Sequence, residues 1–137
     1  MVFALEESLK MMQEEGLENI FQRHEKHKLA VSNAIQALNL KLFAENNSLS
    51  PSITAIESTQ IDAEALRKII KDKYDILLAG GQDHLKGKIF RVGHLGYIND
   101  RDIMIAISAI GLTLLEQKLI SMEELGKALE VAKTHLQ

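Results

Sequence analysis

Segments with helical periodicity alternate along this chain with short apolar runs, and this alternation restricts the folds that the chain can adopt. Apolar residues recur at helical spacing in five segments, namely 2–15, 17–38, 63–73, 101–118 and a last one that ends near Thr134. Short apolar or β-branched runs between them are expected strands, at 40–43, 53–56, 74–78 and 88–92. The pattern predicts an α+β fold: a small, mainly antiparallel sheet of three to four strands with helices packed on one face, preceded by a long helix.

Residues with turn and capping preferences mark the ends of these segments. Gly16 is placed to stop the first helix, and Asn39 to close the second, because asparagine tolerates the left-handed conformation found past helix ends. The polar run 45–51 contains the only proline and is predicted to be a loop. N-caps are expected at Asp62, at Asn99 or Asp100, and at Ser121, where Glu124 completes a capping-box pattern.

Composition excludes several classes of function. The 137 residues suit a single domain. A net charge of −3 argues against a nucleic-acid-binding surface, and the absence of cysteine excludes disulfides and thiolate metal sites. The apolar run 103–115 is too short and too interrupted to span a membrane, and no secretory signal is visible at the N-terminus. We therefore expect a cytoplasmic protein without nucleic-acid or membrane partners.

One arginine stands among glycines in the segment Ala79–Asp100. Arg91 ends a short apolar run, and glycines at 80, 81, 87, 93 and 96 flank it. Glycine is used where the backbone turns sharply or approaches another group closely, and an arginine in such a setting can offer its planar fork to a carboxylate or phosphate. Arg91 is thus a candidate ligand-binding residue. The alternative is a strand arginine in a structural salt bridge, with glycines that serve only turns.

The histidines offer weaker chemistry. His24 and His27 share a helix face, and His84 and His94 flank the Arg91 strand, but no carboxylate or further ligand at a recognised spacing accompanies them, so no metal site is predicted. His94, three residues after Arg91, has either a role near a ligand or a hydrogen bond to backbone in a turn. No residue is predicted to be catalytic.

Three blocks of the sequence resemble, in order, the C-terminal domain of the class V, pyridoxal-phosphate-dependent aminotransferases of the alanine-glyoxylate and serine-glyoxylate type. They are FALEESLKMMQEEGLENIFQRH from Phe3, IDAEALRKIIKDKYDILLAGGQ from Ile61, and LKGKIFRVGHLG from Leu85. In this family the arginine of the third block binds the substrate carboxylate, and the matching position here is Arg91. From their places around Arg91 in the sequence, the candidate neighbours of Arg91 in the cleft are Gly80, Gly81, Gln82, Gly93 and His94.

The resemblance also shows what this chain lacks. Family members are more than twice as long, form homodimers, and bind pyridoxal phosphate through a Schiff-base lysine in a large domain that precedes the matching part. No lysine here has the sequence setting of that nucleophile. The resemblance implies that residues 1–15 are an interdomain linker helix and that residues 16–137 are the small domain. The parent protein is expected to be an aminotransferase with pyridoxal phosphate and a large domain as partners, whereas this chain alone is expected to be inactive and to bind no cofactor tightly.

The first helix separates two hypotheses. Its apolar residues present more surface than a terminal helix usually exposes, so we expect self-association if the chain is a detached small domain. The second hypothesis is a stand-alone, non-catalytic interaction or amino-acid-binding module of the same fold, whose first helix packs on its own core. Some proteins of this family carry the name of a soluble hydrogenase subunit, but a chain without cysteine offers no ligands for hydrogenase metals.

Overall fold

The computed structural model describes residues 1–137, apart from the side chain of Asn46. The helices are α1 (Val2–Glu15), α2 (Leu17–Ala37), α3 (Ala63–Tyr74), α4 (Asp100–Glu116) and α5 (Met122–Leu136). The strands are β1 (Lys41–Leu42), β2 (Ile53–Glu57), β3 (Ala79–Gly80) and β4 (Ile89–Gly93), with 3₁₀ turns η1 (Asn46–Ser48) and η2 (Asp83–Leu85). All four strands pair antiparallel in the order β1-β2-β4-β3, which confirms the predicted α+β class.

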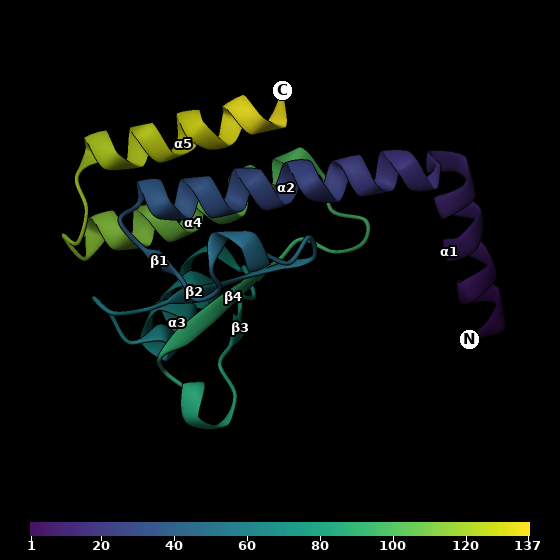
Figure 1. Ribbon diagram of the computed structural model, residues 1–137. Coiled ribbons are helices and arrows are strands. Elements are labelled where there is room, and N and C mark those ends of the chain that lie inside the picture. Colours follow the sequence, from purple (N-terminus) through teal and green to yellow (C-terminus); the bar gives the residue numbers. More distant parts are fainter.

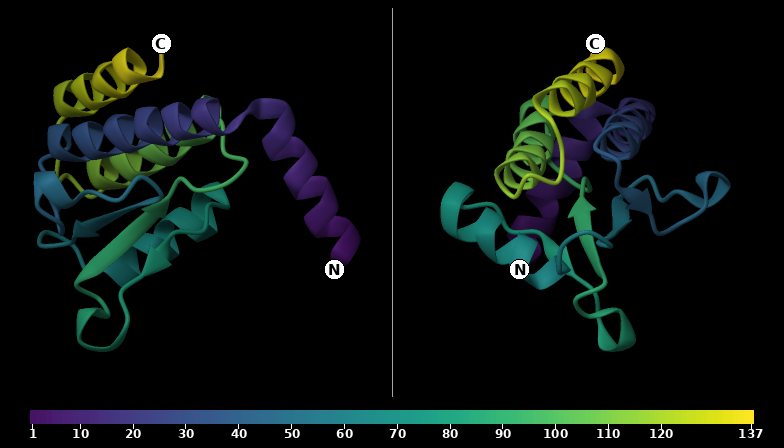
Figure 2. Two further views of the ribbon diagram at one scale, coloured as in Figure 1. Left: turned by 45° about the vertical axis from the view of Figure 1, so that its right-hand side comes forward. Right: turned by 90° about the vertical axis from the view of Figure 1, so that its left-hand side faces the viewer.

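Helices cover one face of the sheet (Figures 1 and 2). In β2 the buried residues are Thr54 and Ile56, and in β4 their cross-strand partners Val92 and Phe90 are buried as well. Because side chains alternate between the faces of a strand, these four define the covered face. Helices α2 and α3 contact the sheet, α4 contacts both of them, and α5 packs on α2 and α4.

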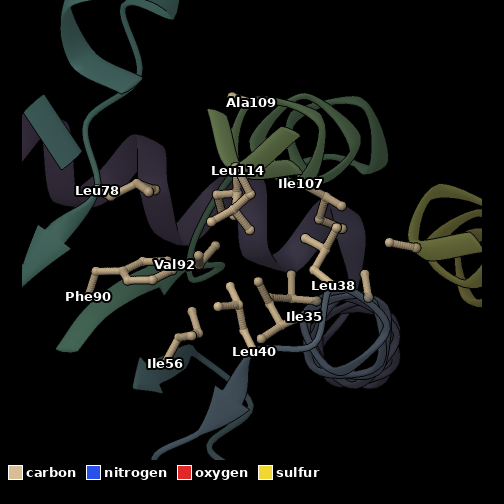
Figure 3. Close-up of a cluster of buried hydrophobic side chains, with 14 of the residues drawn as sticks. Ile35, Leu38, Leu40, Ile56, Leu78, Phe90, Val92, Ile107, Ala109 and Leu114 are labelled. Carbon is tan, nitrogen blue, oxygen red and sulfur yellow. The ribbon is translucent and has the colours of Figure 1, made fainter. Parts of the chain in front are cut away.

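The core lies between this sheet face and the helices (Figure 3). Phe90, Ile56 and Val92 from the sheet form one contiguous cluster with helical residues. These are Ile35 from α2, Leu38 at the C-cap of α2, and Ile107 and Leu114 from α4. Phe90, Ile35 and Leu114 are completely buried. Burying a side chain of this size stabilises a fold by roughly 1.5–3 kcal/mol. This cluster therefore holds β4, the strand that carries Arg91, against the helices.

The predicted caps are present. The side chain of Asp62 accepts hydrogen bonds from the backbone N–H groups of Glu64 and Ala65 at the start of α3. Asn99 and Asp102 form a capping box at α4, so the N-cap is Asn99 and not Asp100. Ser121 and Glu124 form the predicted capping box at α5. Gly16 separates α1 from α2, and Asn39 has the expected positive φ of 58°.

The predicted strand at 74–78 is wrong. Tyr74 is the last residue of α3, and Asp75 ends the helix in the left-handed conformation. Ile76 and Leu78 are apolar because they pack against the core, without pairing to another strand. Strand β3 begins only at Ala79 and contains two residues. An apolar run that packs its side chains on a core looks like a strand in sequence, since burial and not pairing sets the pattern.

Helix α1 leaves the body of the molecule (Figures 1 and 2). Every residue of Val2–Glu15 is described and none is buried. Phe3 is 84% exposed and Leu9 is 50% exposed. The helix therefore does not fold back on its own core, as a stand-alone module would require. No helix among the described residues is both long and apolar enough to cross a membrane.

Candidate functional site

Arg91 lies in the middle of β4 on the open face of the sheet. Its neighbours in sequence, Phe90 and Val92, point into the core, so the side chain of Arg91 projects from the opposite face. Its cross-strand partners are Ala55 on β2 and Ala79 on β3. Directly paired residues project from the same face, and alanine has the smallest side chain that a strand can place there apart from glycine. Arg91 is thus flanked on both sides by small residues.

The guanidinium of Arg91 is held at one nitrogen. Its Nε donates to the carbonyl oxygen of Gly80 at 3.0 Å. Among the described residues, no carboxylate lies within 4.0 Å of Arg91, and none accepts from its two terminal nitrogens. By contrast, Arg23 pairs with Glu15 at 2.6 Å and Arg67 with Glu64 at 2.7 Å. The structure therefore does not support the structural salt bridge considered for Arg91, and leaves two nitrogens of the fork available for a ligand.

Gly80 and Gly81 approach other parts of this chain closely. A Cβ on Gly80 would lie 2.5 Å from Arg67 Nη1 and 2.7 Å from Glu64 Oε1. A Cβ on Gly81 would lie 2.1 Å from the carbonyl oxygen of Leu85, which is backbone and cannot move aside cheaply. Packing within the domain thus requires Gly81, whereas a Cβ on Gly80 would meet only the ends of the Arg67 and Glu64 side chains. Gly80 contributes to the site through its carbonyl group.

Gln82 and Gly93 are more open. Gln82 is exposed and precedes η2 directly. Gly93 pairs with Ile53 on the Arg91 face of the sheet, and a Cβ on it would meet nothing within 4 Å. Because Gly93 has no side chain, it does not obstruct the surface beside Arg91.

His94 lies on the other side of the sheet from Arg91. It is completely buried, its Nδ1 hydrogen-bonds the carbonyl of Pro51 at 3.0 Å, and its Nε2 hydrogen-bonds Oγ1 of the buried Thr54 at 2.9 Å. Because a carbonyl can only accept, Nδ1 carries the proton and Nε2 accepts from the hydroxyl. Burial lowers the pKa of His94 to about 4. His94 thus makes a hydrogen bond to backbone, which was one of its two expected roles. Its side chain does not lie beside that of Arg91.

A second polar cluster, which the sequence reasoning missed, joins α2 to the start of α4. The Nε2 of completely buried His27 donates to Asp100 at 2.9 Å, and Lys26 binds the other oxygen of the same carboxylate at 2.9 Å. Burial raises the pKa of Asp100, but the hydrogen bonds from Lys26 and His27 outweigh it, so the pKa of Asp100 is lowered. Burial lowers the pKa of His27. His27 on the apolar face of a predicted helix was the available signal, although nothing local indicated its partner 73 residues away.

The described residues form no metal-binding cluster, and two lysines have raised pKa values. They contain no group of three or more histidine, aspartate or glutamate side chains that could hold a metal ion. Each lysine is exposed or half-buried. Hydrogen bonds to Asp72 and Glu116 raise the pKa values of Lys68 and Lys73, respectively, which is opposite to the change that makes a lysine nucleophilic. Lys68 and Lys73 therefore lack the lowered pKa of a Schiff-base lysine.

Comparisons with known proteins extend this geometry. No protein-family model matches the chain. It is 54% identical over 114 residues to a protein named soluble hydrogenase, small subunit, of Synechococcus sp., with 83% of this chain and 30% of that protein covered. It is 34% identical to an uncharacterized aminotransferase of Methanocaldococcus jannaschii, with 97% of this chain and 34% of that protein covered.

Solved structures are similar in the same region. The ureidoglycine-glyoxylate aminotransferase of Bacillus subtilis superposes with a TM-score of 0.85 at 30% identity, over 96% of this chain and 35% of that chain. The pyridoxamine-pyruvate aminotransferase of Mesorhizobium loti gives a TM-score of 0.85 at 25% identity, over 93% of this chain and 33% of that chain. This chain spans about a third of the length of these relatives. It is a homologue of the C-terminal part of the class V aminotransferases.

Proposed function

We propose that this chain is the substrate-binding small domain of a pyridoxal-phosphate-dependent transaminase, in which Arg91 binds the carboxylate of the amino acid or oxo acid. The observation that carries the proposal is the half-free fork of Arg91 on the open face of the sheet. Its Nε is fixed by Gly80, its flanking strand positions are alanine, and no described carboxylate competes for the terminal nitrogens. Two parallel N–H groups of a guanidinium match the two oxygens of a carboxylate.

Arg91 acts in this proposal by orientation and charge. A substrate carboxylate bound to its terminal nitrogens is held at a fixed distance from the sheet, so the α-carbon points away from it. The side chain is half-buried, which strengthens the ion pair relative to one in open solvent. Arg91 therefore binds and places the substrate without taking part in bond breaking.

The cofactor belongs to another part of such an enzyme. The described lysines are exposed or half-buried, and hydrogen bonds raise the pKa values of Lys68 and Lys73. The relatives are about three times as long as the region that matches this chain, and we place the cofactor site in their remaining length. On its own, this chain is expected to bind the carboxylate but not to carry out transamination.

The proposal includes a division of the chain into a linker helix, residues 1–15, and the small domain, residues 16–137. Helix α1 buries no residue, and it contacts the rest of the molecule mainly through α2. A groove of about 290 Å³ separates it from the loop after β4, and Met11, Met12, Leu95 and Tyr97 line this groove. An apolar helix beside an apolar groove is the arrangement expected where another domain packs. The alternative of a stand-alone module is less consistent with this exposure.

The proposal is tested by nuclear magnetic resonance on the chain itself. The Nε–Hε signal of Arg91 is followed while L-alanine is added, and L-alaninamide, which lacks the carboxylate, serves as the matched ligand. We expect a saturable shift with L-alanine only. Replacing Arg91 with lysine should weaken binding by about tenfold or more, because a fork with two charge-assisted hydrogen bonds becomes a point charge.

Arg101 provides the control for unspecific attraction of anions. It is exposed, and no described carboxylate pairs with it. Its own signal and the affinity of an Arg101→Gln variant should be unaffected by L-alanine. Equal shifts at Arg91 and Arg101, or equal shifts with L-alanine and L-alaninamide, would mean that Arg91 is not a carboxylate site.

A further inference from the structure

The strand that fixes Arg91 is unusually short. Strand β3 has only two residues, lies at an edge of the sheet and pairs with β4 alone. A two-residue edge pairing supplies few hydrogen bonds, so it does not define the position of a carbonyl group well without further support. The carbonyl of Gly80 nevertheless receives the Nε–H of Arg91. The backbone N–H of Gly81 donates to the carbonyl of Ile89 at 3.1 Å and extends this pairing by one residue. A side chain outside the sheet adds further support to β3.

Arg67 on α3 supplies that support. Its Nε donates to the carbonyl of Leu78 at 2.7 Å, just before β3 begins. Its Nη1 donates to both carboxylate oxygens of Glu64, at 2.8 Å and 2.7 Å. The side chain of Arg67 is 24% exposed and that of Glu64 is 39% exposed, so this ion pair is partly open to solvent. The guanidinium of Arg67 thus links α3 to Leu78, the residue that precedes β3.

Gly80 rests directly on this ion pair. It pairs with the core-facing Phe90, so a Cβ at this position would point toward the helix side of the sheet. Such a Cβ would lie 2.5 Å from Arg67 Nη1 and 3.0 Å from Arg67 Cζ. The missing side chain lets the backbone of Gly80 sit against the guanidinium of Arg67. Arg67 therefore lies against β3 at two points, the carbonyl of Leu78 and the position where Gly80 has no side chain.

We propose that Arg67, held by Glu64, is a positioning residue for Arg91. It acts through Leu78 and Gly80: it fixes the two-residue strand, and the strand presents the carbonyl that orients the Arg91 fork. The functional meaning of this relay rests on the proposed role of Arg91 as the carboxylate-binding residue. Free arginine side chains have large rotamer freedom, so a fixed Nε reduces the entropy that carboxylate binding must remove.

The test compares two variants on the same helix. Arg67→Met removes the donors and retains the aliphatic length, whereas Lys68→Met removes a neighbouring positive charge that pairs with Asp72 within α3. In the Arg67→Met variant we expect the Arg91 Hε to exchange with solvent about threefold to tenfold faster, the factor for loss of one ordinary hydrogen bond. Affinity for L-alanine should fall by a similar factor. Lys68→Met should change neither quantity.

Two further variants keep the test decisive if Arg67→Met unfolds the domain. Arg67→Lys retains the charge but cannot reach Leu78 and Glu64 with one fork, so it should give an intermediate Arg91 exchange rate. Gly80→Ala leaves every donor in place and adds only the methyl group that meets Arg67, so it should also disturb the Arg91 signal.

The relay is refuted if a folded Arg67→Met or Gly80→Ala variant leaves the Arg91 Hε exchange equal to that of wild type. The two proposals fail separately. If Arg67→Met accelerates Arg91 exchange but L-alanine shifts no signal in the wild-type chain, then Arg67 positions Arg91 and the carboxylate role of Arg91 is wrong.

Discussion

At the scale of single residues, Arg91 and His94 show that residues close in sequence can lie on opposite faces of a sheet, because side chains alternate along a strand. They are close in sequence, yet the side chain of Arg91 projects from the open face while His94 is buried with Thr54. The glycine pattern around Arg91 made it a candidate from sequence, and the resemblance to the aminotransferases favoured the ligand-binding role over a structural salt bridge. The burial of His94 was not visible there, because its partners Thr54 and Pro51 precede it by about 40 residues.

The buried His94 makes the stability of the domain depend on pH. The ordinary pKa of histidine is 6.5, and burial lowers the pKa of His94 to about 4 in the folded state. Between these values the unfolded state binds more protons than the folded state, so the free energy of unfolding falls as the pH falls from about 6.5 toward 4. For this residue the loss reaches about 3 kcal/mol. The lowered pKa of His27 adds a loss of the same sign.

Urea unfolding at several pH values across this range measures the effect. His94→Gln removes the titrating group, and we expect it to flatten the pH dependence while costing about 1–3 kcal/mol at neutral pH through unsatisfied partners. His84→Gln replaces an exposed histidine and should leave the slope unchanged. A wild-type slope in His94→Gln would exclude His94 as the source.

At the scale of elements, features that depend on residues within one turn could be predicted from the sequence. Features that depend on contacts between distant parts of the chain could not. The capping box at Ser121 and Glu124 and the cap at Asp62 depend on residues within one turn, and both were predicted. The position of β3 involves Arg67 on α3, which contacts Leu78 and Gly80. Helix α3 continues to Tyr74 and ends at the left-handed Asp75, so the strand was placed too early in the sequence. Short strands take their position from their neighbours more than from their own residues.

The packing of α4 on α5 provides a test with a matched pair of glycines. A Cβ on Gly111 of α4 would lie 2.4 Å from Leu125 Cδ1 of α5, whereas a Cβ on Gly126 of α5 would meet nothing. We expect Gly111→Ala to destabilise the domain by about 1–3 kcal/mol through overpacking. Gly126→Ala should stabilise it by about 0.4–1 kcal/mol, because alanine has less conformational freedom to lose.

Thermal or urea unfolding of the two variants measures both changes. The opposite signs make the comparison independent of the helix propensity of alanine, which is the same in both. Stabilisation by Gly111→Ala would show that α5 is free to move away from α4.

At the scale of the whole molecule, α1 is the unusual part. The apolar side chains of Val2, Phe3 and Leu5 are exposed, together with the groove beside the loop after β4. The sequence indicated this surface, since the apolar spacing of the helix was visible, but it left open whether the helix folds back. The structure answers that question, because no residue of α1 is buried.

We expect the chain to self-associate through α1 when it is alone in solution. Exposed apolar surface contributes roughly 25 cal/mol per Å² when it is removed from water, so pairing of two α1 faces is favourable. Sedimentation should show association that depends on concentration. The double change Phe3→Ser and Leu9→Ser should abolish it, whereas Leu77→Ser, at an exposed apolar residue far from α1 in sequence, should not. A chain that is monomeric at every concentration would contradict this expectation.

The junction at Gly16 determines the direction in which α1 extends from the body of the molecule. Gly16 is the single residue between the two helices and has a φ of 83°. Arg23 on α2 forms an ion pair with Glu15, the last residue of α1. A helix of this length extends about 21 Å, so a rotation of about 20° at its base would sweep the far tip through about 7 Å. Small adjustments of the Gly16 backbone angle or of the Arg23–Glu15 ion pair are therefore magnified at the far end of α1.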